Sequence, residues 1–179
     1  MNSVLLSLFE YKAWANTELH LALSQFDAQL YPRQFSAMLL ILDHANVVDR
    51  IFQGHLMGAT SAKPIPRFKV TNSEVLPTLA ELRALVISTD DWYLQLVASI
   101  SAERLNQRVY FTFVDGDHAC MSCQEILLHL ITHAGYHRGS IGQILEDLGL
   151  DSPPDSLTKF LHRTQPERRL HPVAEANAI

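Results

Sequence analysis

Apolar residues recur every three or four positions along four long stretches of the chain, and polar residues, glycine or proline separate these stretches. Such spacing is typical of amphipathic helices that bury one face. The pattern predicts helices over residues 3–25, 34–57, 74–99 and 123–148. Gly149 follows the last stretch, in the position where a glycine commonly ends a helix. The chain is therefore expected to be mainly helical.

The segment between the third and fourth predicted helices has a different pattern. It contains "VYFTFV", which is rich in β-branched and aromatic residues, followed by "DG", a strong signal for a tight hairpin turn. We therefore expect a small β-hairpin within residues 108–122. Ser122 and Glu125 have the spacing of a capping box, which marks the start of the last long helix. Together these elements predict an all-α fold: a four-helix bundle with a small β-hairpin before the last long helix.

The remaining segments are loops and a tail. Residues 58–73 contain prolines and turn residues and are expected to form a loop. Residues 150–163 allow one short helix. We expect a single domain over residues 1–163, followed by a polar, frayed tail over residues 164–179.

Length and composition limit the class of protein. The 179 residues suit one domain, and 47% of them are hydrophobic, which is ample for a core. The formal net charge of −5 disfavours general binding to nucleic acid or to anionic membranes. No apolar run approaches the roughly 20 residues that a membrane-spanning helix needs, and the N-terminus reads as a helix start rather than a signal peptide. We expect a cytoplasmic protein without nucleic-acid or membrane partners.

Three histidines lie on faces that the apolar pattern predicts to be buried. On the last long helix, His133 and His137 are four residues apart, in the middle of the apolar stripe that includes Leu130 and Ile141. His44 lies within the apolar stripe of the second predicted helix. Two imidazoles at this spacing can bind one cation, and a third from a facing helix would leave a coordination position open for catalysis.

Other histidines fit such a site less well. His129 lies at the edge of the apolar stripe. His55 is 11 residues from His44, or about 16 Å along a helix axis, too far to share a site with it. The competing hypothesis is that His44, His133 and His137 are buried structural residues without a metal, although imidazoles buried without partners are costly.

The remaining chemical motifs are weak. Cys120 and Cys123 form one Cys-x-x-Cys pair, which lacks the further thiolates of a zinc site or the fold context of a redox motif. Cys123 is predicted at the first helical position, where the helix dipole lowers a thiol pKa. Lys12, Asn16 and Tyr136 are candidates to reach a substrate.

Several motifs resemble the DinB family of bacterial damage-inducible-type proteins. They are "YKAWAN", "LDHANVVDRIF", "VDGDHACMSCQEILLHLITHAGYHRGSIGQIL" and "LGLDSPP", and the resemblance covers most of residues 4–160. Its most specific part is His-x-x-x-His-Arg-Gly. Ser140 stands where many members have glutamine after this motif, which changes the groups expected to orient the imidazoles. Arg138 lies off the histidine stripe, and we expect it to make a helix–helix or dimer contact.

The resemblance implies a four-helix bundle that often forms homodimers, with metal ligands at His44, His133 and His137. It also implies a relation to metal-dependent transferases that use small cellular thiols. Zinc, nickel, copper and iron all suit three imidazoles. Three functions stay open: a metal-dependent enzyme of thiol-transferase or hydrolase type, a non-catalytic metal-binding stress-response protein, and a structural protein without metal.

Overall fold

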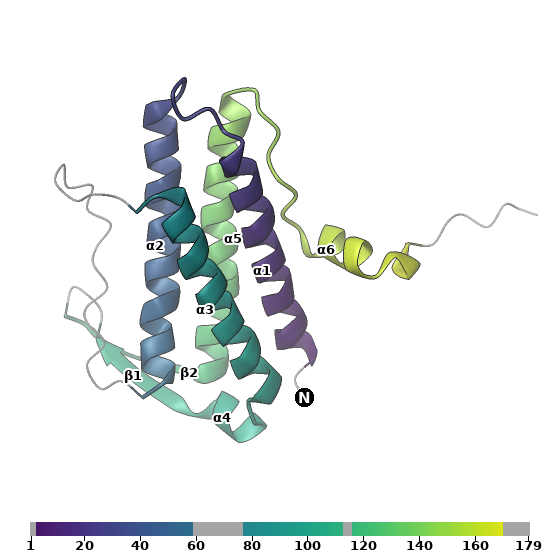
Figure 1. The fold of residues 1–179 in the computed structure, drawn as a ribbon. Coiled ribbons are helices and arrows are strands. Elements are labelled where there is room, and N and C mark those ends of the chain that lie inside the picture. Colours follow the sequence, from purple (N-terminus) through teal and green to yellow (C-terminus); the bar gives the residue numbers. More distant parts are fainter. Residues whose placement is uncertain (1–2, 59–76, 113–115, 170–179) are drawn as a thin grey trace, which may run out of the picture.

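Four long helices form the body of the protein (Figure 1). The computed structural model describes residues 3–58, 77–112 and 116–169. The long helices are α1 (Ser3–Ser24), α2 (Pro32–Leu56), α3 (Leu79–Ser99) and α5 (Cys123–Asp147). Neighbouring helices pack in the ring order α1, α3, α2, α5, so α1 and α2 lie diagonally across the bundle. This arrangement confirms the predicted all-α four-helix bundle.

Side-chain caps determine where two of the helices begin. Ser122 and Glu125 form the predicted capping box, and α5 begins directly after it. Helix α3 begins at Leu79 rather than at residue 74, because Thr78 is its N-cap and makes a capping box with Glu81. Pro77, directly before this cap, is not helical. The first residues of the predicted helix, 74–76, lie outside the described residues.

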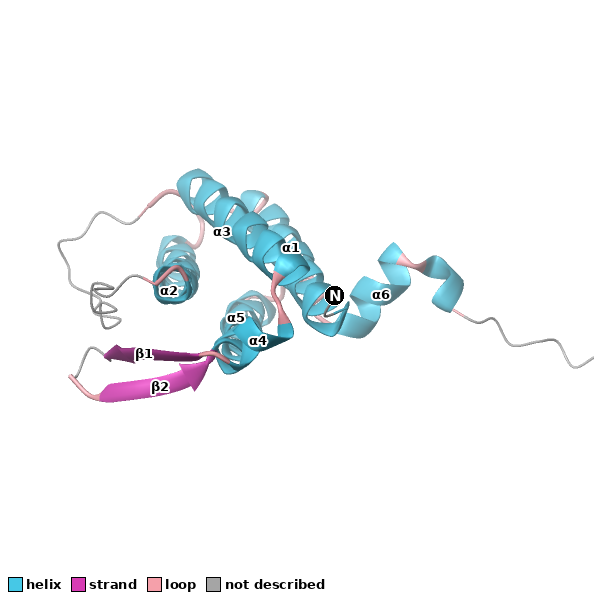
Figure 2. Cartoon of the chain, turned by 90° about the horizontal axis from the view of Figure 1, so that it is seen from below, coloured by secondary structure: helices cyan, strands magenta, loops and turns pink. Residues whose placement is uncertain are grey.

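A β-hairpin precedes α5, as predicted. Strands β1 (Arg108–Thr112) and β2 (His118–Ser122) pair antiparallel, and Figure 2 shows them beside the ends of α2 and α5. Gly116 has φ +95°, which favours glycine in the turn. The remainder of the predicted turn, residues 113–115, lies outside the described residues. Sequence periodicity did not predict α4 (Ala102–Asn106), because its single turn is too short to show a period.

The C-terminal segment contains the short helix predicted after Gly149. This helix, α6, spans Leu157–Thr164, and a 3₁₀ turn follows at Pro166–Arg168. Residues 170–179 and most of the predicted 58–73 loop lie outside the described residues, so the tail and the domain boundary stay predictions. Within the described ranges, no helix is both long and apolar enough to cross a membrane.

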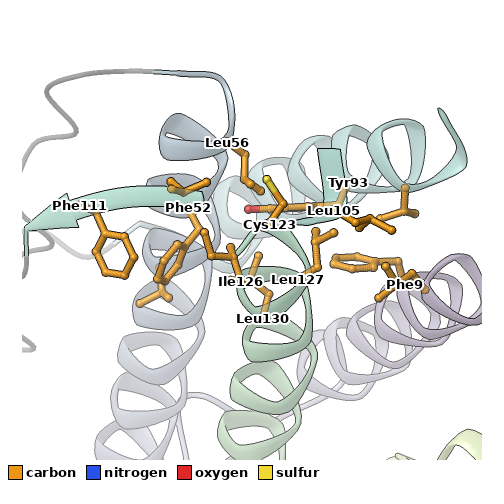
Figure 3. Close-up of a cluster of buried hydrophobic side chains, with 14 residues drawn as sticks. Phe9, Phe52, Leu56, Tyr93, Leu105, Phe111, Cys123, Ile126, Leu127 and Leu130 are labelled. Atoms are coloured by element: carbon orange, nitrogen blue, oxygen red, sulfur yellow. The ribbon is translucent and has the colours of Figure 1, made fainter. Parts of the chain in front are cut away.

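The interior has two apolar clusters with polar side chains between them. The cluster near the hairpin includes Phe9, Phe52, Tyr93, Phe111 and Leu130 (Figure 3). The other cluster comprises the buried residues Leu19, Leu23, Met38, Leu39, Leu42, Leu82, Ile141 and Leu145. Between them along the four helices lie the buried polar residues Lys12, Asn46, Asp49, Thr89, Asp90 and Arg138, and the buried His20 lies next to Leu19 of the second cluster. The candidate site lies at this level of the bundle.

Candidate metal centre

Helices α2 and α5 bring together the three histidines that the apolar pattern singled out. His133 and His137 lie one turn apart on α5, and their Nε2 atoms are 3.1 Å apart. The ring of His44, from α2, lies 5.4 Å from that of His133 and 4.8 Å from that of His137, between centroids. One ligand atom from each residue lies within 4.8 Å of the other two. The group could therefore hold a metal ion.

Burial keeps these imidazoles in the form that binds metals. It lowers the pKa of His44 and of His137 below the ordinary value of 6.5. At His133, burial and the neighbouring histidines lower the pKa to about 3. All three rings are therefore neutral near pH 7, and a neutral imidazole nitrogen is a metal ligand.

The donor set fits a divalent cation. Two nitrogens that each lie about 2.0–2.1 Å from one zinc ion can be separated by up to about 4.2 Å, and the Nε2 atoms of His133 and His137 are closer than that. The three side chains are only partly buried, so an incoming ligand can approach them. In contrast, Nδ1 of His133 is buried without a hydrogen-bond partner among the described residues. This ring therefore lacks the hydrogen bond that usually orients a metal-binding histidine.

His129 and His55 lie outside the group that could hold a metal. The His129 ring is 5.3 Å from that of His133, between centroids, and also packs on Phe52. His55 packs on Phe52 and on Phe111 of the hairpin. Both histidines thus belong to an aromatic cluster beside the triad.

A buried ion-pair network lies at the same level of the bundle. The Lys12 ammonium of α1 lies 2.7 Å from a carboxylate oxygen of Asp49 on α2 and 2.7 Å from one of Asp90 on α3. Lys12, one of the candidates to reach a substrate, is 1% exposed and belongs to this buried network. The sequence could have predicted this burial, because Lys12 falls on the apolar stripe of α1, three residues after the buried Phe9.

Arg138 makes the helix–helix contact that was expected of it. Its guanidinium donates to Asn16 of α1 over 3.0 Å and to both carboxylate oxygens of Asp155, which precedes α6. Asn16 also donates to Asp90 and therefore belongs to the same network rather than to a substrate site. The hydroxyl of Ser140 donates to the carbonyl of Tyr136, one turn back on α5.

Two further predicted residues have clear surroundings. Tyr136 is 73% exposed, and its ring meets that of His137 edge to face with centroids 5.2 Å apart. It remains a candidate to contact a ligand at the triad. Cys123 is the first residue of α5 but is fully buried in the apolar cluster. Burial raises the pKa of its thiol, so the predicted lowering by the helix dipole is wrong. Cys120 and Cys123 are both free thiols.

The fold and the triad define a class: all-α bundles in which facing helices bring histidines to a site that could hold a metal ion. The model of the DinB family matches residues 1–169, and the chain belongs to this family. Among curated proteins, Protein DinB of Bacillus subtilis (strain 168) is 22% identical over 176 residues, covering 94% of this chain and 99% of that protein.

Proposed function

We propose that the protein is a metal-dependent enzyme that transfers a small thiol to a carbon electrophile, with His44, His133 and His137 holding one divalent ion. The observation that carries this proposal is the convergence of three neutral, partly exposed imidazoles from two facing helices. A site formed by three protein ligands has a position for an exogenous molecule, as catalytic zinc sites do.

The protein's own residues would hold the reacting thiol in place through the ion. A divalent ion bound by neutral ligands keeps its full charge and would lower the pKa of an entering thiol, so that the thiol binds as thiolate. The thiol proton would leave to solvent. The sulfur would form a bond to the carbon, and the leaving group would depart with the electron pair of the bond that breaks. His133 and His137 would fix the position of the ion, and with it that of the thiol, because one rigid helix carries both residues.

The chemistry of the donor set favours thiol transfer over hydrolysis. A thiolate is already a strong nucleophile, whereas activation of water commonly uses a positioned general base. The described residues that could jointly hold the ion are all histidines. The nearby buried carboxylates of Asp49 and Asp90 are paired with Lys12. Hydrolysis and non-catalytic metal binding remain the alternatives that the experiment must separate.

The test is a screen of metal-loaded protein with several low-molecular-weight thiols and a chromogenic carbon electrophile. Thioether formation is followed by absorbance and mass spectrometry. We expect turnover by the wild-type protein and only the uncatalysed rate from His44→Ala, which lacks one donor. Product that contains water in place of the thiol would favour the hydrolase. Equal rates for the two proteins, with metal still bound by the wild type, would favour the non-catalytic protein.

The homodimer implied by the family resemblance also stays a proposal. Light scattering of the metal-loaded protein should give twice the mass of one chain. A single-chain mass across a wide concentration range would contradict it.

A further inference from the structure

A small cavity lies inside the bundle, beside the charged network. Its volume is about 20 Å³, and residues from all four long helices line it, among them Asn16, His20, Asn46, Asp49 and Arg138. A cavity needs roughly 10–15 Å³ of this kind of volume to hold one water molecule, and the water needs two to four polar partners. The cavity is therefore large enough for one water molecule, and six of the twelve residues that line it are polar.

Two residues that line the cavity each have a buried polar atom without a hydrogen-bond partner among the described residues. The two atoms are Nε2 of His20 on α1 and Oδ1 of Asp49 on α2. These residues are only 4% and 5% exposed, so bulk water does not reach the two atoms freely. A buried polar atom without a partner costs about 1–3 kcal/mol. Two such atoms at one cavity point to a molecule that bonds to both.

The chemistry of these atoms defines what the cavity binds. His20 Nδ1 lies 2.8 Å from the backbone carbonyl of Asn16. Because a carbonyl oxygen only accepts, Nδ1 carries the hydrogen and donates. Burial lowers the pKa of His20, which keeps the ring neutral, so Nε2 is an acceptor. The carboxylate oxygen of Asp49 is also an acceptor. The bound molecule must therefore donate two hydrogen bonds.

The charges around the cavity favour a neutral molecule over a cation. The buried charged groups are two cations, Lys12 and Arg138, and two anions, Asp49 and Asp90, which balance. Lys12 already lies 2.7 Å from each carboxylate and would repel a second cation. Arg138 uses three of its five N–H groups in the bonds to Asn16 and Asp155, so it retains donors for an incoming oxygen.

We propose that this cavity is a binding site for one ordered water molecule, which donates to Asp49 Oδ1 and to His20 Nε2. The water links α1 to α2 across the diagonal of the bundle, parallel to the Lys12–Asp49 ion pair. Asp49 lies five residues after His44 on α2, so this link helps to hold the helix that carries one member of the triad. The cavity adjoins the triad, because His137 also lines it, but the water site does not require that the triad binds a metal.

A crystal structure of the metal-free protein, at a resolution that places ordered waters, tests the proposal directly. We expect one density peak within about 3.2 Å of both His20 Nε2 and Asp49 Oδ1. The proposal is overturned by a cavity without density, by a peak with the contacts of a metal ion, or by a His20 ring rotated onto a protein partner.

A measurement in solution gives a second test. Relaxation dispersion of the water oxygen nucleus counts the water molecules that stay bound longer than the protein tumbles. His20→Leu removes one acceptor and should lose one long-lived water, whereas His118→Leu on the exposed face of β2 should lose none. If His20→Leu does not fold, Ala134→Val fills the cavity from α5 and should lose the same water. An unchanged count in the folded cavity variant contradicts the proposal.

Discussion

The histidine triad and the charged network are two polar groups at the same level of one bundle, and they differ in how their hydrogen bonds are completed. In the network, the Lys12 ammonium lies between Asp49 and Asp90, and Arg138 pairs with Asp155. Charges of opposite sign therefore meet within the protein. In the triad, three neutral imidazoles face one another, and each offers a nitrogen that could bind a cation.

This difference separates a structural role from a binding role. A buried charge that pairs within the protein contributes to the specificity of helix packing, whereas breaking the pair leaves an uncompensated charge. In the triad, by contrast, one nitrogen is left unpaired, because His133 Nδ1 is buried and has no hydrogen-bond partner in the described part of the chain. A buried polar atom without a hydrogen-bond partner destabilises the fold, and such local exceptions are typical of functional sites. The following experiments test this distinction.

The largest effect is expected from breaking the network. Lys12→Met leaves the Asp49 and Asp90 carboxylates buried without their cation, which should lower the free energy of unfolding by about 3–5 kcal/mol. Urea unfolding of the metal-free protein measures this change. The control is Lys159→Met on the exposed face of α6, which should change it by less than about 0.5 kcal/mol. A similar small change for both variants would show that the network is not structural.

The triad should respond in the opposite direction. His133→Leu keeps most of the side-chain volume and removes the buried, unpartnered Nδ1. In the metal-free protein we expect the free energy of unfolding to rise by about 1 kcal/mol, because the cost of that atom is lost. Urea unfolding beside the exposed control His118→Leu measures it. A loss of stability as large as that of Lys12→Met would place the triad among the structural groups.

Acidification should weaken the metal-free protein through its buried histidines. Burial lowers the pKa of His133 to about 3 from 6.5, and it also lowers that of His44 and His137. Between these values the unfolded chain binds more protons than the folded one, so stability is present above about pH 6.5 and falls as the pH decreases. Unfolding midpoints between pH 7 and pH 5 measure the slope. His133→Leu should reduce it, and an equal slope in both proteins would contradict this origin.

The smallest effect is expected just outside the triad. His129→Phe keeps a ring against Phe52 and His133 and removes both nitrogens. Because His129 is not in the group that could hold an ion, we expect unchanged metal stoichiometry and an affinity changed less than threefold, or about 0.6 kcal/mol. Calorimetric titration with zinc measures both. Loss of the ion in this variant would extend the site to His129.

The sequence pattern predicted the histidine triad but not the network around it. His44, His133 and His137 lie on the apolar stripes of long helices, and the helical period is enough to place such residues on a shared interior. Asp49 lies outside the stripe of α2 that contains His44, yet it is buried. Helix α2 packs on two neighbours, α3 and α5. It therefore buries more than one face, and a single apolar stripe does not reveal the second face.

Elements with little periodicity were harder to predict. The one-turn helix α4 has no repeat to detect, and α3 begins later than its apolar pattern because Thr78 and Glu81 cap it. The thiol of Cys123 was misjudged because the helix position is visible in the sequence, whereas the depth of burial depends on how the hairpin and α2 pack around it. Tertiary packing, rather than local sequence, decides these features.

The central claim is that the triad binds a metal ion, and elemental analysis of the protein purified without chelator tests it most directly. After supplementation with zinc, nickel, copper or iron, we predict close to one divalent ion for each wild-type chain. His133→Leu should lose that ion, because His133 belongs to the triad. His118→Leu should keep it, because His118 does not belong to the triad. Wild-type protein that carries none of these metals, or an ion retained by His133→Leu, would contradict the account.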